Sequence, residues 1–342
     1  MLTNMIKMLC LPFELNPIMQ GYQYTAFPMS IIQGNAKSDL TPWLCGKHIN
    51  CCYNTNQVSD KYSMSTCVSE CYCYCRGENV LKFQHISFEK ETYEIVGLNL
   101  IEFVKRLIQT SHYICGHYDE YYIKNKSAYN KFHYRHDYIL FGYDDEKQIF
   151  YSAGYTNRNI YEGFNISYDD YLKSLVNLNE EQIEFNIWRY NFEFEYKFDL
   201  KRVLIGFENY INSNCTKETS IEGYVYGINS LRLLKQNFEE ILRSKDENID
   251  IRYTRNFVEH QYLMLMRLKY ISQKIICDLN DIANEYEKIY SKALLIHNNA
   301  IKYNIMKNKT SVELIVLLMD EIINYEENNL SKFYKALIRC DS

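Results

Sequence analysis

The pattern of apolar residues changes near Phe198, and this change most constrains what the chain can fold into. Before Phe198, short runs of β-branched and aromatic residues are separated by polar turns, a pattern typical of strands with a few helices. After it, apolar residues recur at intervals of three and four, as in amphipathic helices. We therefore expect an α+β protein with an antiparallel sheet in residues 1–198 and a helical region, packed as a bundle, in residues 199–342.

Several elements of the first part can be predicted from local signals. Asn99 can cap a helix over 100–109, whose apolar residues share one face. Proline suits a first helical position, so we expect another short helix to begin at Pro28. Candidate strands are rich in tyrosine, isoleucine and phenylalanine; they cover 112–123, 137–143, 148–153 and 185–198. The second and third of these flank a polar turn and predict an antiparallel hairpin.

The second part contains three long helical tracts, near residues 252–278, 280–305 and 310–338, after a helix that Asp199 can cap. In the last tract, Thr310 or Ser311 is the expected cap. The apolar stripe expected to be buried there consists of Leu314, Leu318, Ile322 and Tyr325. Glu259-His260 could line a pocket, but a solvated helix face is the favoured interpretation.

Composition excludes several classes of function. The 342 residues are 47% hydrophobic and 24% charged, which is the balance of a globular protein. The sequence has no apolar run of about 18 residues and no export signal, so we expect a cytoplasmic protein without a membrane partner. Lys and Arg number 38 against 43 Asp and Glu, giving a net charge of −5. This charge argues against nucleic acid and favours a small molecule or a protein as partner.

The twelve cysteines are unevenly placed, and seven of them crowd one segment: Cys45, Cys51, Cys52, Cys67, Cys71, Cys73 and Cys75. Without an export signal we expect mostly free thiols. The cluster Cys67–Cys75 lacks the paired Cys-x2-Cys spacing of a zinc site. The group His112, His117, His133 and His136 suggests a metal only by its number. We therefore expect no metal, and no nucleotide-binding or cofactor motif is present.

The most informative segment begins at His136. The histidine stands at the head of a predicted strand that runs into Gly142-Tyr143-Asp144-Asp145 and back along a second strand. Papain-fold cysteine enzymes present their general base in this way. There, a thiol at a helix N-terminus has its pKa lowered by the helix dipole and the imidazolium. The next strand supplies an Asp or Asn that orients the ring.

With these features the chain resembles the butirosin biosynthesis protein H family, whose N-terminal half is similar to the bacteriocin-processing, double-glycine-type cysteine peptidases. The segments that carry the resemblance follow the same order along the chain. They are the helix Leu100–Gln109, the strand beginning Tyr113-Ile-Cys-Gly-His, the His136 strand, the helix start Ile166–Leu172, Tyr226-Gly227-Ile228-Asn229-Ser230, and Glu259-His260 with Arg267-Leu268.

The resemblance implies a papain-like fold for residues 1–198 and amide-forming acyl transfer in secondary-metabolite biosynthesis. A carrier-protein thioester would give its acyl group to a cysteine and then to an amine, with His136 as the base. The implied partners are an acyl or peptidyl carrier protein and a small amine acceptor, and a homodimer is compatible with them. No cofactor is implied.

The sequence departs from this family at the nucleophile. The cysteine is expected within residues 21–30, where Tyr24 or Thr25 stands instead. Cys45, which precedes a glycine, is the best substitute, while Cys51 and Cys52 look like part of a strand. Asn157 can replace the missing Asp of the third position. The alternative hypothesis is a catalytically inactive relative that binds a carrier protein, a peptide or a natural product.

Overall fold

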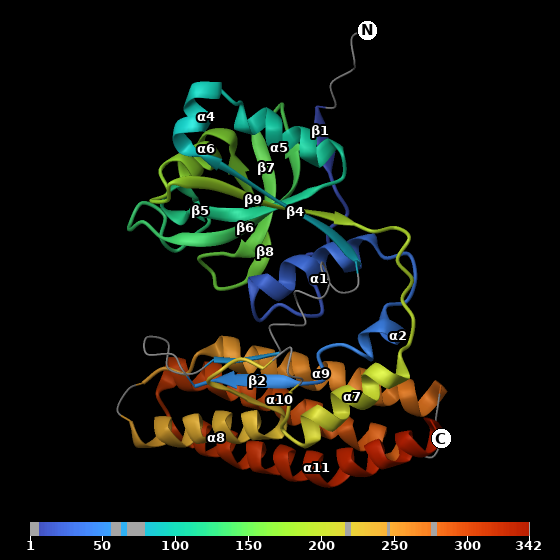
Figure 1. Ribbon diagram of the computed structural model, residues 1–342. Coiled ribbons are helices and arrows are strands. Elements are labelled where there is room, and N and C mark those ends of the chain that lie inside the picture. The colour runs from blue at the N-terminus through green and yellow to red at the C-terminus, as the bar shows by residue number, and fades with distance from the viewer. Residues whose placement is uncertain are drawn as a thin grey trace. The chain divides into compact units, whose positions relative to one another are not determined.

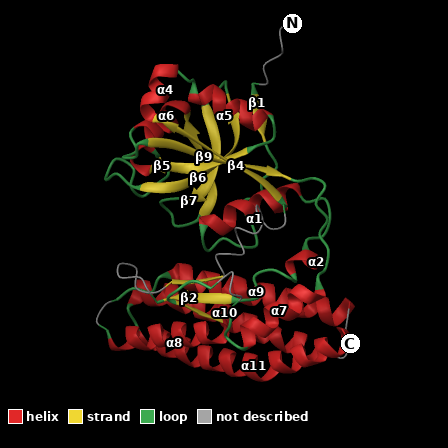
Figure 2. Ribbon diagram, in the orientation of Figure 1, coloured by secondary structure: helices red, strands yellow, loops and turns green. Residues whose placement is uncertain are grey.

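The computed structural model describes residues 7–55, 63–66, 79–215, 220–244, 247–274 and 279–341. The chain forms two compact units, Met1–Lys37 with Tyr72–Phe194, and Ser38–Cys71 with Glu195–Ser342. Strands gather in the first unit, and helices make up most of the second (Figures 1 and 2). The expected α+β class, with an antiparallel sheet and a helical C-terminal region, is confirmed. Ser38–Cys71 joins the second unit because its strand pairs with one that follows residue 198.

The first unit is built on a seven-stranded sheet with the order β4-β9-β5-β6-β7-β8. Strand β1 pairs with the end of β6 that β5 leaves uncovered. The strands are β1 (Met8–Cys10), β4 (Leu81–Glu89), β5 (Tyr113–Asp119), β6 (Arg135–Asp144), β7 (Ile149–Tyr155), β8 (Tyr161–Ser167) and β9 (Gln182–Tyr190). All the pairings are antiparallel, and the expected β6–β7 hairpin is confirmed.

The strand predicted over 185–198 ends earlier, at Tyr190. Asn191 ends it, since its side-chain amide donates to the Asn79 carbonyl and its side-chain oxygen accepts from the Glu193 amide. A side chain that bonds the backbone two residues on makes a turn. The aromatic alternation after Tyr190 therefore does not belong to the sheet.

Helices cover both faces of this sheet: α1 (Gln23–Asn35), α4 (Lys90–Val96), α5 (Leu100–Gln109) and α6 (Tyr168–Val176). Figure 1 shows α1 on one side and α4, α5 and α6 on the other. Asn99 caps α5 as predicted, accepting from the Glu102 amide at 3.0 Å. The prediction that a helix begins at Pro28 is wrong, because α1 begins at Gln23 and contains the proline.

The second unit combines a three-stranded sheet, of order β10-β2-β3, with six helices among the described residues. Its strands are β2 (Cys51–Asn54), β3 (Ser63–Thr66) and β10 (Tyr224–Tyr226); its helices are α2 (Thr41–Leu44), α7 (Leu200–Ile211), α8 (Gly227–Arg243), α9 (Ile251–Lys274), α10 (Asn280–Met306) and α11 (Lys309–Asp341). Asp199 caps α7 as predicted. Among the described residues, no helix is long and apolar enough to cross a membrane.

The predicted stripe on α11 is buried in part. Leu318 and Ile322 are buried as predicted, whereas Leu314 is 41% exposed. This helix also buries Val312, Ile315, Met319 and Ile323. The helix also begins earlier than expected, because the Asn308 side chain accepts from the Thr310 amide at 3.0 Å. Asn308 thus caps the start of α11, the role that was predicted for Thr310 or Ser311.

A buried polar network joins four helices of the second unit, α7, α9, α10 and α11, around Glu326. Tyr210 donates to Glu326 Oε2 at 2.6 Å, and the Tyr286 hydroxyl contacts both Glu326 and, at 2.5 Å, Gln261 Oε1. Tyr286 has one hydrogen and cannot donate to both acceptors. A protonated Glu326 completes the network by donating to Tyr286. In agreement, burial raises the pKa of Glu326.

This network predicts that Glu326→Gln stabilises the protein increasingly as the pH rises. A carboxyl whose pKa is raised on folding stabilises fully below the unfolded value, about 4.3, and this contribution is lost as pH rises through the folded value. Gln can donate and accept as protonated Glu does, without that loss. Thermal unfolding followed by circular dichroism from pH 5 to 9 should show the difference between variant and parent growing with pH.

Glu321→Gln is the matched control, since Glu321 lies on the same helix, is exposed and pairs with Lys292. Glu321→Gln should change the stability to thermal unfolding only slightly between pH 5 and 9. A pH-independent difference between Glu326→Gln and the parent would show that Glu326 is ionised in the folded protein.

Candidate functional site

The candidate site lies where β5 ends and β6 begins. The antiparallel register places Tyr118 opposite His136 and His117 opposite Asp137. Successive strand residues point to opposite faces of a sheet, and paired residues share a face. His136 and Tyr118 therefore share one face, while His117 and Asp137 share the other.

A short turn after β5 brings a carboxyl group to His136. Asp119 caps the 3-10 helix η1 (Glu120–Tyr122), accepting from the Tyr121 amide at 3.0 Å and from the Tyr134 amide at 3.1 Å. The Glu120 amide donates to the Tyr134 carbonyl at 2.9 Å. These bonds tie the end of β5 to the residues before β6. The position of Glu120 is therefore fixed by backbone hydrogen bonds.

Glu120 and His136 form an imidazole–carboxylate pair. His136 Nδ1 lies 2.6 Å from Glu120 Oε1. The side chain of Glu120 is 7% exposed and that of His136 is 32% exposed. A carboxylate can only accept, so Nδ1–H donates to it, and in the neutral ring Nε2 keeps its lone pair. An oriented imidazole that reaches solvent is suited to take a proton from a substrate.

Lys126 places a positive charge behind this pair. Its Nζ lies 3.6 Å from Glu120 Oε1 and donates to the Tyr155 carbonyl at 2.6 Å. It also lies over the Phe164 ring, 5.0 Å from the centroid. Burial lowers the pKa of Lys126 to about 8, although Glu120 opposes that shift. When charged, Lys126 forms an ion pair with the Glu120 carboxylate.

Gln23, the first residue of α1, bridges β6 and β7. Its Nε2 donates to the Asp137 carbonyl at 3.1 Å, and its Oε1 accepts from the Tyr155 amide at 3.0 Å. The β6–β7 ladder ends at Ile139 and Ala153, so this amide extends the contact between the strands. Gly154 makes room for it, since a Cβ there would lie 2.7 Å from Gln23 Oε1. The start of α1 thus lies beside the strand that carries His136.

We predict that Gln23→Met destabilises the first unit. The apolar side chain has a similar length but leaves the Tyr155 amide and the Asp137 carbonyl without this partner, at a cost of about 1–3 kcal/mol for each group that stays buried. Urea unfolding measures the change. Gln84→Met, at an exposed position of β4, should change the free energy of unfolding by less than about 0.5 kcal/mol. Equal effects of the two substitutions would refute the bridging role.

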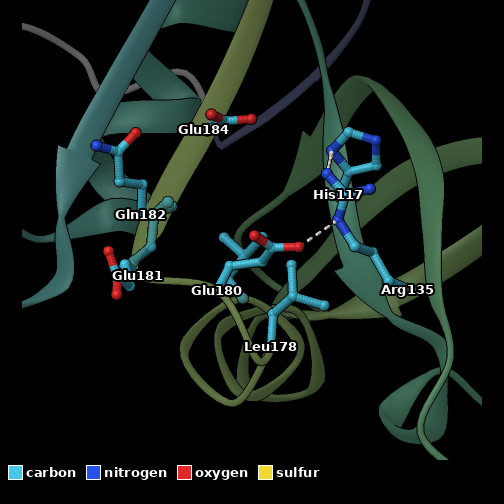
Figure 3. Close-up of a pocket in the computed structure, with 9 residues that line it drawn as sticks. His117, Arg135, Leu178, Glu180, Glu181, Gln182 and Glu184 are labelled. Carbon is cyan, nitrogen blue, oxygen red and sulfur yellow. Dashed lines mark hydrogen bonds and ion pairs between the residues drawn. The ribbon is translucent and has the colours of Figure 1, made fainter.

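A cavity of about 270 Å³ lies near the other face of the sheet (Figure 3). Arg135 donates to His117 Nδ1 at 2.9 Å and forms an ion pair with Glu180 at the same distance. The lining residues are His117, Arg135, Leu175, Leu178, Glu180, Glu181, Gln182, Ile183 and Glu184. Since His117 points away from the face of His136, we do not join this cavity to the Glu120–His136 pair.

The other predicted histidines do not form a metal site with His136. His133 Nδ1 lies 2.5 Å from Asp119 Oδ2, and His117 Nε2 lies 2.9 Å from Asp137 Oδ1. Among the residues that the structure describes, no group of three or more His, Cys, Asp or Glu could hold a metal ion. His117 and His133 are instead each paired with a carboxylate, and His112 Nδ1 lies 2.9 Å from Thr110 Oγ1.

Cys45 lies in the second unit, whereas His136 lies in the first. The thiol is buried, and burial raises the pKa of Cys45 to about 12 despite the nearby Arg267. Arg267 Nε donates to the Cys45 carbonyl at 2.7 Å, which fixes this segment on α9. A buried thiol with a raised pKa is a weak nucleophile. The geometry is that of a structural cysteine.

The remaining predicted positions have structural partners. The Thr25 hydroxyl donates to the Tyr22 carbonyl at 2.7 Å, and the Tyr24 ring stacks on Tyr22. Asn157 lies in the exposed turn after β7, and its backbone amide donates to the Asn125 carbonyl at 2.7 Å. The imidazole is oriented by Glu120, the role that was predicted for Asn157.

The other described cysteines are free thiols, as expected: Cys10, Cys51, Cys52, Cys115 and Cys215. Cys51 and Cys52 lie in β2, as their sequence context predicted. Burial raises the pKa of Cys51, whose Sγ lies 3.0 Å from Ser230 Oγ. The predicted cluster of Cys67, Cys71, Cys73 and Cys75 lies outside the described residues.

Glu259 and His260 do not form a solvated face, which corrects the favoured interpretation. Both are buried in α9. Glu259 accepts from Arg255 Nε at 2.8 Å, and His260 Nε2 donates to the Ile49 carbonyl at 2.9 Å. Burial lowers the pKa of His260 to about 4, so the ring is neutral at pH 7. It holds the segment before β2 on the helix.

Cys45 should therefore react slowly with iodoacetamide in the folded protein. Its thiol is inaccessible and its pKa of about 12 leaves little thiolate at pH 7. Peptide mapping by mass spectrometry should show Cys10, which is exposed, alkylated before Cys45. Rapid labelling of Cys45 that is lost in His136→Ala would instead show a catalytic thiol. Unfolding in urea should make the two cysteines equally reactive.

Glu120, Lys126 and Gln23 are the site residues that sequence reasoning missed. Tyr118-Asp119-Glu120 was expected to continue a strand, and an acidic pair before two tyrosines was the available sign of a capped turn. Lys126 and Gln23 give no local signal, because their roles depend on strands that lie far away in the sequence.

Comparison of the sequence with models of known families gives no match, and a search of curated proteins gives none either.

Proposed function

We propose that the first unit supports acyl transfer from a thioester to a small amine, with His136 as general base. The observation that carries this proposal is the 2.6 Å hydrogen bond between His136 Nδ1 and the buried Glu120 carboxyl, with the imidazole still reaching solvent. This bond keeps Nε2 available as the proton acceptor. Because the Cys45 thiol is buried and its pKa is raised, the amine attacks the thioester directly in our proposal.

The step balances without a protein thiol. The amine nitrogen forms a bond to the thioester carbonyl carbon while His136 Nε2 takes one N–H proton. The C–S bond then breaks, an amide remains, and the imidazolium returns the proton to the leaving thiolate. Glu120 stabilises the transient imidazolium, and Lys126 lies beside the Glu120 carboxyl.

Two features support a relation to the papain-like fold of the butirosin biosynthesis protein H family. A histidine heads a strand of an antiparallel sheet and is followed by the expected hairpin. The first helix of the unit begins beside that strand, where Gln23 bonds the Asp137 carbonyl. On this relation, an acyl or peptidyl carrier protein supplies the thioester, and the protein acts in the cytoplasm on a secondary metabolite.

A second candidate function is binding without catalysis, which two observations favour. The amide of Gln23 occupies the start of α1, where the family carries its cysteine, and it bonds backbone groups there. The Cys45 thiol is buried with a raised pKa. A relative that had lost its nucleophile would show both features and would still bind a carrier protein, a peptide or a natural product.

The test uses the acetyl thioester of N-acetylcysteamine, a carrier mimic, with hydroxylamine as the acceptor. The proposal predicts hydroxamate formation above the buffer rate, and a decrease of about 100-fold or more in His136→Ala, the usual contribution of a general base. Glu120→Gln should lower the rate in the same direction, because the amide cannot neutralise an imidazolium.

His133→Ala is the matched control, because His133 also pairs with a carboxylate in the same segment and is more exposed. It should leave the rate unchanged. Intact mass spectrometry during turnover should show no acylated protein. An acylated cysteine would replace direct transfer by a covalent route. Absence of turnover, together with saturable binding of an acyl carrier protein, would favour the second candidate.

A further inference from the structure

A second cavity of the first unit, with a volume of about 310 Å³, lies at the C-terminal end of α1. Its walls come from the segment after β1, the end of α1, the start of β5 and the end of β9. The lining residues are Leu11, Pro12, Gly34, Asn35, Ala36, Lys37, Ser111, Tyr113, Tyr190 and Phe192. Helix α1 has 13 residues, so about 20 Å separates this cavity from Gln23 at the other end of the helix.

Asn35 contributes a hydrogen-bond acceptor to this cavity. Its Nδ2 donates to the Ile31 carbonyl at 2.8 Å and to the Tyr113 hydroxyl at 2.7 Å, and it lies 3.2 Å from the Pro12 carbonyl, to which the Tyr113 hydroxyl donates. The Ile31 and Pro12 carbonyls can only accept hydrogen bonds, so the amide nitrogen, and not the amide oxygen, must face them. The oxygen Oδ1 is then turned the other way, and no described residue donates to it. Because Asn35 lines the cavity, this oxygen can accept a hydrogen bond from a ligand that supplies a donor.

Lys37 and Phe192 stand at the exposed edge of the same cavity. Lys37 Nζ lies 5.7 Å from the centroid of the Phe192 ring, and no carboxylate among the described residues pairs with it. Phe192 is 60% exposed, although its ring packs edge-on against the buried Tyr190 at 5.0 Å. A cation without an anion and an exposed aromatic ring therefore border an apolar hollow.

We propose that this cavity binds a small aromatic carboxylate that carries a hydrogen-bond donor. The ring of the ligand packs between Tyr190, Phe192 and Tyr113, its donor bonds Asn35 Oδ1, and its carboxylate pairs with Lys37. A ligand that carries an alkylammonium group in place of the carboxylate would put a second cation beside Lys37 and is disfavoured. The site depends neither on His136 nor on the acyl-transfer chemistry.

The probe is 4-hydroxybenzoate, and saturation-transfer difference NMR on the full chain measures its binding. We expect a dissociation constant of about 1 mM or below, in line with ten ligand atoms at modest efficiency. Benzoate, which lacks the donor, should bind about fivefold more weakly. Lys37→Gln should weaken 4-hydroxybenzoate about two- to fivefold and leave neutral 4-hydroxybenzyl alcohol unchanged. Phe192→Ala should weaken both ligands.

Lys131→Gln/Phe132→Ala is the matched control, since these exposed neighbours carry the same two side chains elsewhere on the unit. Binding should be unaffected in this variant and in His136→Ala, which separates the inference from the proposed function. The inference is overturned if the parent protein shows no saturable binding. It is also overturned if Lys37→Gln and Phe192→Ala bind as the parent does, or if 4-hydroxybenzylamine binds as tightly as 4-hydroxybenzoate.

Discussion

The pairing of β5 with β6 is the constraint on which the candidate site depends. One register sets Tyr118 opposite His136 and sends His117 and Asp137 to the other face. A shift by one residue would exchange the faces and separate the imidazole from Glu120. The bonds of Asp119 to the Tyr121 and Tyr134 amides reinforce this register at the end where the ladder stops. The chemistry of His136 is therefore a consequence of strand pairing as much as of the residue itself.

Much of the architecture could be predicted from the sequence, because local patterns determine it. The β6–β7 hairpin, the Asn99 cap and the long C-terminal helices follow from alternation, cap residues and periodicity. Helix ends that depend on tertiary contacts could not be predicted from the sequence. Helix α1 extends five residues before Pro28, where Gln23 bonds two strands from elsewhere in the unit.

Only part of the candidate site could be predicted from the sequence, because only some of its residues are marked by a local pattern. His136 has a local signature, since a histidine precedes a strand and a turn. Its partner does not, because Glu120 reaches the ring only after a capped turn has reversed the chain. Cys45 has the neighbouring glycine of a reactive cysteine but lies against α9, and sequence alone does not show burial. The burial of Glu259 and His260 likewise depends on the strand segment that packs over them.

The division of the chain into units has a consequence for biosynthesis. Ser38–Cys71 precedes most of the first unit in the sequence, yet its strand β2 pairs with β10, which lies more than 150 residues later. A ribosome that has delivered the last strand of the first unit has delivered β3 but not β10, the other partner of β2. The first unit can thus fold while the nascent chain holds within it a strand, Cys51–Asn54, with one edge still unpaired. Until β10 and the helices of the second unit emerge, that edge is open to pairing with other chains.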